Sequence, residues 1–107
     1  MKETELIEKF DRTRICEIYN SWPEIAKNIF ESDLKPIQIH AIDHIVFCGM
    51  GGSGALGDIF SAILSRTSIH VSVVKGYLLP KTVDKKTLVV ITSVSGNTQE
   101  TFSVLNE

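Results

Sequence analysis

The sequence contains few cysteines and no long apolar run, and each shortage excludes a class of protein. With only Cys16 and Cys48 among 107 residues, the chain is not a disulfide-rich extracellular scaffold. No apolar run reaches the roughly 20 residues that a membrane-spanning helix needs. The polar and acidic start, residues 1–5, does not fit a signal peptide. We therefore expect a cytoplasmic chain with two reduced thiols and no membrane partner.

A large excess of charge of either sign is also missing. The 11 Lys and Arg residues and the 13 Asp and Glu residues give a net charge of −2, and the cations are scattered along the chain. This distribution argues against nucleic acid as a partner. A hydrophobic share of 43% with 22% charged residues is typical of globular proteins. The length suits one small domain without a separate second core.

The first third of the sequence has helical periodicity. Residues 3–19 mix polar and apolar side chains, with one broad apolar face. Ser21 and Pro23 indicate the start of a second helix, because Ser21 can cap it and Pro23 suits a first turn. Pro36 marks the exit from this region. We therefore predict an N-terminal helical segment over residues 1–35.

The remainder alternates short strands with helices. Apolar or β-branched runs of strand length occupy residues 44–48, 69–74 and 87–92. Helical patterns cover residues 53–66 and the stretch after residue 97. This alternation predicts an α/β fold, a three-layer sandwich with a parallel sheet. The last helix reaches Glu107 without a stop signal, so we expect residues 36–107 to be the first part of a larger, truncated domain with only about three of its strands.

A glycine-rich turn, residues 49–54 (GMGGSG), joins the first strand to its helix. Glycines let the backbone approach the oxygens of a phosphate and permit positive φ, and the following helix N-terminus offers unpaired N–H groups. Ser53 adds a hydroxyl donor. The alternative is that the glycines only allow a sharp turn and close packing. The spacing matches neither a dinucleotide fingerprint nor a Walker motif.

A second turn, residues 93–98 (SVSGNT), joins the third strand to the last helix. Three hydroxyls and an amide lie within these six residues, whereas a plain helix cap, the alternative interpretation, needs only one such side chain. In a parallel sheet both turns lie at the carboxyl edge. The sequence therefore predicts that the two turns hold one phosphate between them.

Together the two turns resemble the sugar isomerase (SIS) domain, which has a flavodoxin-like parallel sheet. Within that family, GMGGSG paired with SxSGNTxET is most similar to the bifunctional phosphoglucose/phosphomannose isomerases, and the resemblance covers residues 42–107. By the family's pattern, the residues that contact the sugar phosphate are Gly52, Ser53, Ser93, Ser95 and Thr98. One departure is Val94, where the family usually has Tyr. We expect this change to affect packing more than phosphate binding.

The resemblance implies an enzyme that interconverts glucose 6-phosphate or mannose 6-phosphate with fructose 6-phosphate. It also implies a cytoplasmic homodimer with no metal and no cofactor. The reaction needs a base that moves a proton between C1 and C2 through an enediol. In the family, this base and the groups that open the sugar ring lie beyond residue 107. No catalytic residue is therefore assigned in this chain, and we expect the chain alone to be inactive.

Two alternatives stay open. A non-catalytic SIS module that senses a phosphosugar in a regulator would use the same turns, although residues 1–40 contain no convincing helix-turn-helix. Another SIS enzyme, such as a phosphoheptose isomerase or the isomerase half of an amidotransferase, would differ beyond residue 107.

Other reactive side chains are interpreted as structural. Cys48 ends a buried strand and suits packing rather than nucleophilic attack. Asp58 and Glu100 lie in the first turns of helices, where the helix dipole favours a carboxylate. The three histidines have no spacing typical of a metal site. An approach of Lys75 and Tyr77 to the ligand, from beyond a strand end, stays an alternative.

Overall fold

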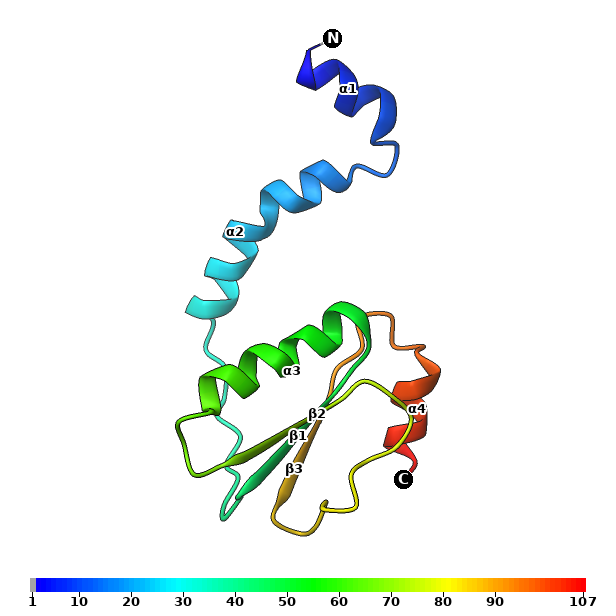
Figure 1. Ribbon diagram of the computed structural model, residues 1–107. Helices are drawn as coiled ribbons and strands as arrows, with labels where there is room; N and C mark the ends of the chain where they lie inside the picture. The colour runs from blue at the N-terminus through cyan, green and yellow to red at the C-terminus, as the bar shows by residue number, and fades with distance from the viewer. Residues whose placement is uncertain (1) are drawn as a thin grey trace. The chain divides into compact units, whose positions relative to one another are not determined.

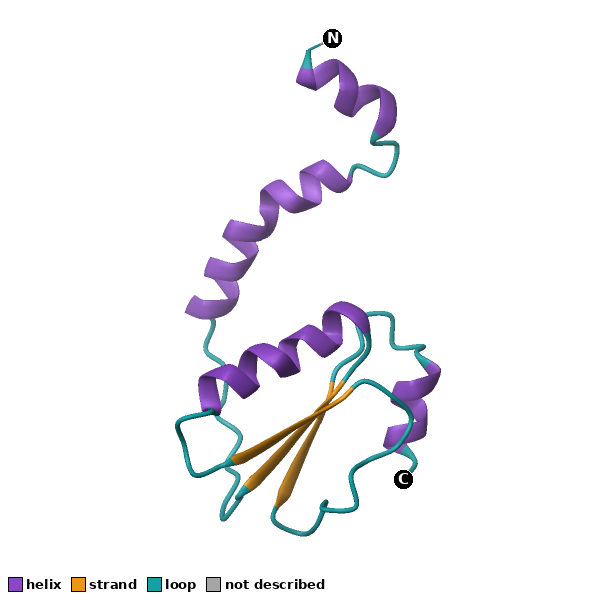
Figure 2. Ribbon diagram, viewed as in Figure 1, coloured by secondary structure: helices purple, strands orange, loops and turns teal. Residues whose placement is uncertain are grey.

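The structure, a computed structural model, describes residues 2–107 and divides the chain into two units (Figure 1). One unit ends at Ile37 and the other spans Gln38–Glu107. The first unit holds α1 (Glu3–Phe10) and α2 (Ile15–Glu31). The elements of the second unit are β1 (His44–Cys48), α3 (Gly51–Leu64), β2 (His70–Val74), β3 (Thr87–Ile91) and α4 (Gln99–Leu105) (Figure 2). No helix within residues 2–107 is long and apolar enough to cross a membrane.

The start of α2 differs from the prediction. Asp11 follows α1, and its carboxylate accepts hydrogen bonds from the N–H groups of Ile15 (2.8 Å) and Cys16 (2.7 Å). These two bonds cap α2 at its first turn. Ser21 therefore lies inside the helix, where its hydroxyl donates to a carbonyl of the preceding turn at 2.7 Å, and Pro23 also lies inside it. The predicted helix start at Ser21 is wrong because Asp11 caps an earlier turn.

The helices of the first unit have apolar faces that no core covers. None of the residues of α1 or α2 is buried. Phe10 is 69% exposed and Phe30 is 90% exposed, and the rings of Tyr19 and Trp22 meet edge-on with centroids 4.5 Å apart. Both helices are amphipathic, yet within this unit their apolar side chains remain open to solvent.

The second unit is built on a three-stranded parallel sheet in the order β2-β1-β3. The last residue of β1, Cys48, is in register with Val74 of β2 and Ile91 of β3. The chain passes from the central strand to one edge and then returns to the other edge. The direction of winding therefore reverses between β1 and β3. In open α/β sheets, ligands bind at the carboxyl ends of the strands at such a reversal.

α3 covers one face of the sheet. The rings of Phe47 in β1 and Phe60 in α3 stack with centroids 5.1 Å apart. A Cβ atom on Gly57 would lie only 2.9 Å from side-chain atoms of Phe47 and Val73. Glycine at this position therefore lets α3 approach the sheet closely.

α4 covers the opposite face. Its Val104 is 3% exposed and belongs to the core cluster that contains Val46 and Cys48. Successive residues of a strand point to opposite faces, so the face of Val46 is not the face of Phe47. The loop from β2 to β3 adds Leu79 to this cluster. The predicted α/β class, with two helical layers around a three-stranded parallel sheet, is confirmed.

Candidate functional site

The first glycine-rich turn begins in register with the sheet. The N–H of Gly49 donates to the carbonyl of Val74 at 3.0 Å, which anchors the turn to the end of β2. Gly51 then adopts φ +54°, a conformation that favours glycine. Gly51 is also the first residue of α3, and the N–H of Gly54 donates to the carbonyl of Met50 at 3.3 Å.

The glycines of this turn differ in what surrounds them, and therefore in whether a larger residue would fit the position. A Cβ on Gly54 would lie 2.5 Å from the carbonyl oxygen of Gly49, and a Cβ on Gly49 would lie 2.9 Å from the backbone of Ser53. Close packing therefore explains these two glycines. A Cβ on Gly52 would meet no atom within 4 Å, and its φ is not positive. Neither packing nor backbone conformation accounts for Gly52, whereas an anion in the open space beside it would.

The amino end of α3 lacks a side-chain cap within the described residues. Met50 is the N-cap residue and makes no side-chain capping bond. Ser53 is half-buried in the first turn of α3. The first N–H groups of a helix have no partner within the helix, so this end of α3 can donate to an anion.

The second turn gathers three hydroxyls. The Oγ atoms of Ser93 and Ser95 each lie 3.3 Å from Oγ1 of Thr98. Ser93 also accepts the N–H of Gly96 at 3.0 Å, and Ser95 accepts the N–H of Asn97 at 3.3 Å. A hydroxyl that accepts such a bond still has its own proton to donate, either to another hydroxyl of this turn or, in its place, to a ligand.

The structure does not support the plain helix cap as an explanation of the second turn. Thr98 is the N-cap residue of α4, yet its side chain makes no capping bond. Gly96 adopts φ +65°, and a Cβ there would meet nothing within 4 Å. Val94, the departure from the family pattern, is 94% exposed. Its side chain therefore does not displace the neighbouring hydroxyls.

Both turns leave the same edge of the sheet (Figure 1). Cys48 and Ile91 end neighbouring strands in register, and the N–H of Thr92 donates to the carbonyl of Cys48 at 2.9 Å. The predicted site residues on the two turns are thus placed at the winding reversal between β1 and β3. The side-chain hydrogen bonds of the second turn stay within that turn.

Two neighbours of the site have partners that the sequence did not indicate. Nζ of Lys75 lies 2.6 Å from the Asp58 carboxylate, so Asp58 has an ion-pair partner in addition to the favourable helix dipole. Glu100 raises the pKa of Tyr77, because a carboxylate that hydrogen-bonds to the phenol and carries a negative charge disfavours the phenolate. The position of Lys75 directly after a strand indicated that it could approach the ligand. Nothing in the sequence indicated that Asp58 is its partner.

The cysteine and histidine side chains do not add a reactive centre here. Burial raises the pKa of the Cys48 thiol, which disfavours the reactive thiolate. Both ring nitrogens of His44 are within hydrogen-bond distance of hydroxyls, those of Ser72 and Thr87. No three His, Cys, Asp or Glu side chains within residues 2–107 are grouped so that they could hold a metal ion.

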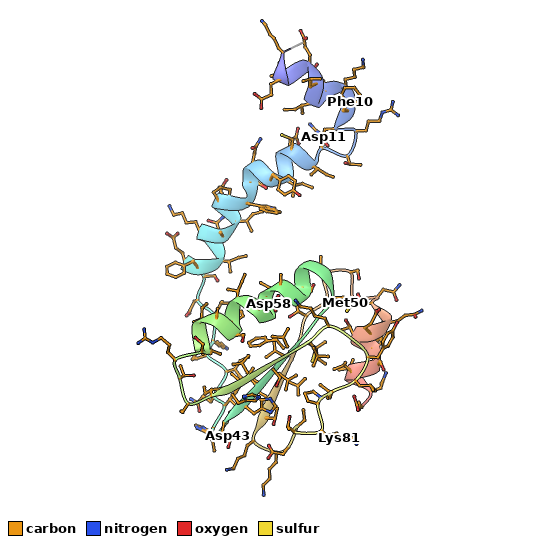
Figure 3. All side chains as sticks on the ribbon, in the orientation of Figure 1. Phe10, Asp11, Asp43, Met50, Asp58 and Lys81 are labelled. Atoms are coloured by element: carbon orange, nitrogen blue, oxygen red, sulfur yellow. The ribbon has the colours of Figure 1, made fainter. Side chains whose placement is uncertain are left out.

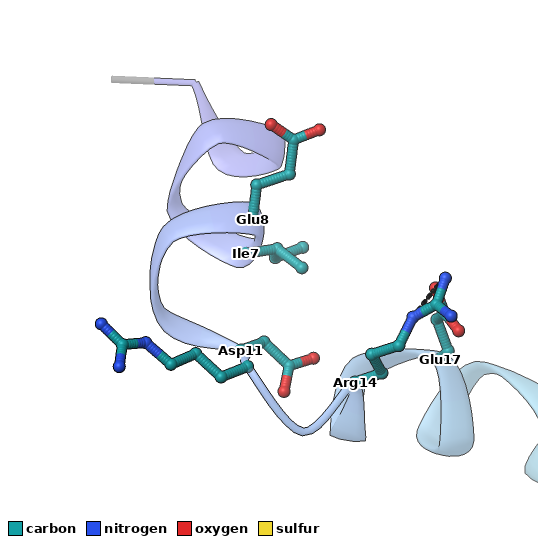
Figure 4. A pocket seen from close by; sticks show the side chains of 6 residues that line it. Ile7, Glu8, Asp11, Arg14 and Glu17 are labelled. Carbon is teal, nitrogen blue, oxygen red and sulfur yellow. Dashed lines mark hydrogen bonds and ion pairs between the residues drawn. The ribbon is translucent and has the colours of Figure 1, made fainter.

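A pocket of about 450 Å³ lies in the first unit, between the end of α1 and the start of α2 (Figure 4). Three of its polar side chains have partners nearby: Asp11 caps α2, and Arg14 pairs with Glu17 at 2.9 Å. A second, mainly apolar hollow shares Ile7 and Asp11 with it. Neither hollow contains a residue of the two turns at residues 49–54 and 93–98.

Sequence comparison finds similar proteins of established name. The chain is 46% identical over 88 residues to a bifunctional phosphoglucose/phosphomannose isomerase of Aquifex aeolicus, which covers 80% of this chain and 24% of that protein. It is 40% identical over 85 residues to the protein of the same name from Caldicellulosiruptor bescii, over 78% of this chain and 24% of the relative. A D-glucosamine-6-phosphate 4-epimerase of Sulfolobus acidocaldarius is 30% identical over 83% of this chain and 27% of its own length.

No protein-family model matches the chain, and no solved structure matches it significantly. The chain spans about a quarter of the length of the curated relatives that it matches. The expected resemblance is nevertheless confirmed by several proteins of one name. Over about four fifths of its length, this chain is similar to part of the bifunctional phosphoglucose/phosphomannose isomerases.

Proposed function

We propose that this chain is the phosphosugar-binding part of an aldose–ketose isomerase that interconverts glucose 6-phosphate or mannose 6-phosphate with fructose 6-phosphate. The names of the similar proteins support an isomerase of hexose phosphates. The observation that carries the binding role is the open space at Gly52, at the uncapped amino end of α3. We further propose that residues 36–107 form the first part of an SIS domain.

In this proposal the phosphate accepts hydrogen bonds from both turns. The N–H of Gly52 and the hydroxyl of Ser53 donate from the start of α3, and the hydroxyls of Ser93, Ser95 and Thr98 donate from the other side. A hydrogen bond to a charged group contributes about 1.5–3 kcal/mol, and a helix N-terminus adds about 0.3–1 kcal/mol. Several donors together offset the cost of removing water from a dianion, whereas one capping hydroxyl does not.

The phosphate is remote from the bond that changes. Isomerisation moves a proton between C1 and C2 through an enediol, so the role of these turns is to hold the sugar in a fixed position for a base. We assign no catalytic base within this chain. We therefore propose that the chain alone binds the sugar without converting it, which a coupled isomerase assay on the 107-residue chain can check.

The epimerase among the relatives defines the second candidate. It shares the hexose phosphate class in its name but catalyses a different reaction. In our proposal the two turns contact only the phosphate, so the same turns would serve either reaction. Activity of the complete protein with fructose 6-phosphate favours the isomerase, whereas activity confined to an amino sugar phosphate favours the epimerase. We also propose that the complete protein is a cytoplasmic homodimer.

The binding role is tested by Ser95→Ala. Because Ser95 is exposed and donates to the phosphate in our proposal, we expect fructose 6-phosphate affinity to fall by about 1–3 kcal/mol with little change in folding. Ser65→Ala is the matched control, since Ser65 lies beyond the far end of α3 and donates only to the carbonyl of Ala62. Calorimetry that finds equal affinity for both variants would reject the role of Ser95.

A further inference from the structure

The proposed phosphate site contains no cation among its assigned residues. Gly52, Ser53, Ser93, Ser95 and Thr98 are all neutral. Among the five residues that follow each strand, Lys75 is the single cation. It stands directly after Val74, whose carbonyl anchors the first turn through Gly49. The sheet topology therefore places one ammonium-bearing side chain beside the turn that we propose to bind a dianion.

The side chain of Lys75 lies against the start of α3. Its Cγ and Cε atoms are each 3.2 Å from the position that a Cβ on Gly54 would take. Gly54 directly follows Ser53 of the proposed site, and Nζ is one bond beyond Cε. Glycine at position 54 therefore makes room for the lysine stem, and the stem carries the ammonium along the first turn of the helix.

Asp58, one helical turn further along α3, holds that ammonium. The distance from Nζ of Lys75 to the carboxylate is 2.6 Å, and Figure 3 labels Asp58 on α3 together with Met50 before its first residue. The two side chains are 47% and 57% exposed. An ion pair this exposed adds little to folding stability, so stability alone does not account for a lysine laid across Gly54.

We propose that Lys75 supplies the positive charge of the phosphosugar site and that Asp58 holds its ammonium beside the amino end of α3. This inference rests on the proposed function. The lysine adds a cation to a site made otherwise of N–H groups and hydroxyls. The carboxylate opposes it, so the affinity for the phosphate depends on both members of the pair with opposite signs.

Lys75→Met tests the charge separately from the packing, because methionine keeps an apolar stem over Gly54. We expect the affinity of the full chain for inorganic phosphate and fructose 6-phosphate to fall about tenfold, as for one lost charge-assisted contact. Asp58→Asn should tighten binding about two- to fivefold, as for an exposed charge pair. Lys75→Arg should keep most of the affinity. Lys27→Met, which breaks an exposed pair in α2, is the control and should leave affinity unchanged.

A purely structural role for the Lys75–Asp58 ion pair makes a different prediction. If Lys75 and Asp58 only held the turn in shape, both variants would weaken binding alike and would lower the unfolding midpoint alike. That result, or unchanged binding in both, overturns the inference while the proposed function stands. The dependence of affinity on salt is a further measurement that a purely structural role would not change. The affinity of the wild-type chain should fall more steeply with ionic strength than the affinity of Lys75→Met. If the wild-type chain binds neither probe, the proposed function fails and this inference fails with it.

Discussion

Neighbouring glycines of one motif can have different roles, as Gly52 and Gly54 illustrate. Gly54 is buried, and any side chain there would collide with the carbonyl of Gly49. Gly52 is exposed and faces open space. The sequence alone does not distinguish the two glycines, because both belong to one motif. The structure divides them into a glycine that close packing requires and one that faces the open space where we propose that the phosphate binds.

Alanine at each position should separate these roles. Gly54→Ala should lower the free energy of unfolding by about 1–3 kcal/mol through overpacking. Gly52→Ala should leave it unchanged or raise it by about 0.4–1 kcal/mol, yet weaken phosphosugar binding because its methyl group occupies the space that we assign to the anion. Denaturant unfolding and calorimetry measure the two effects. Full binding by Gly52→Ala would contradict the proposed position of the phosphate.

The pKa of Tyr77 gives a second test at this scale. Glu100 raises it, so the contact favours the folded state below the ordinary tyrosine pKa and is lost as the pH rises through the higher folded value. Glu100→Gln should move the pKa of Tyr77 down toward its ordinary value. Absorbance of the phenolate, recorded in a Tyr19→Phe background, follows Tyr77 alone. An unchanged titration in Glu100→Gln would exclude Glu100 as the cause.

The amino edge of the sheet joins all three strands through side chains. Thr87 in β3 donates to the carboxylate of Asp84 at 3.2 Å, and its Oγ1 lies 3.3 Å from Nδ1 of His44. Nε2 of His44 lies 2.9 Å from Oγ of Ser72 in β2. His44 is only 6% exposed. Its ring therefore depends on these two hydroxyls for its hydrogen bonds.

Ser72→Ala should remove one of these bonds and leave a buried nitrogen without a partner. We expect the unfolding free energy to fall by about 1–3 kcal/mol, with phosphosugar affinity unchanged because this network lies at the edge opposite the two turns. Ser65→Ala, an exposed serine in the same unit, should change stability much less. Chemical denaturation compares the two variants, and equal midpoints would show that the network adds nothing to the sheet.

The elements were predictable where local sequence determines them. The run at residues 44–48 is apolar, short and followed by glycine, and β1 has those bounds. The start of α2 was missed because Asp11 caps it across a turn, where no adjacent cap residue signals a helix. Both turns were found from glycine and hydroxyl spacing. The ion pair of Lys75 with Asp58 was not, because 17 residues separate the partners and only the crossover from α3 to β2 brings them together.

At the scale of the whole chain, many more large apolar side chains are exposed than buried among the described residues. Only Val46, Cys48 and Val104 form the buried apolar core among the described residues. Phe30 is 90% exposed, and Ile63 on α3 is 64% exposed. β2 and β3 are the edges of the described sheet, and each edge strand has unpaired backbone groups that can join another chain.

These features predict that the isolated 107-residue chain associates with itself. Burial of apolar surface contributes roughly 25 cal/mol per Å², so pairing the exposed helix faces of two copies offers a gain that a lone copy does not have. We expect light scattering to report a mass above 11.9 kDa that rises with concentration. Phe30→Ser should reduce association, whereas Lys27→Gln, which keeps a polar side chain at an exposed position of the same helix, serves as the control. A monodisperse monomer at every concentration would mean that the exposed apolar faces and sheet edges do not mediate self-association. The proposed homodimer would then need contacts from outside this chain.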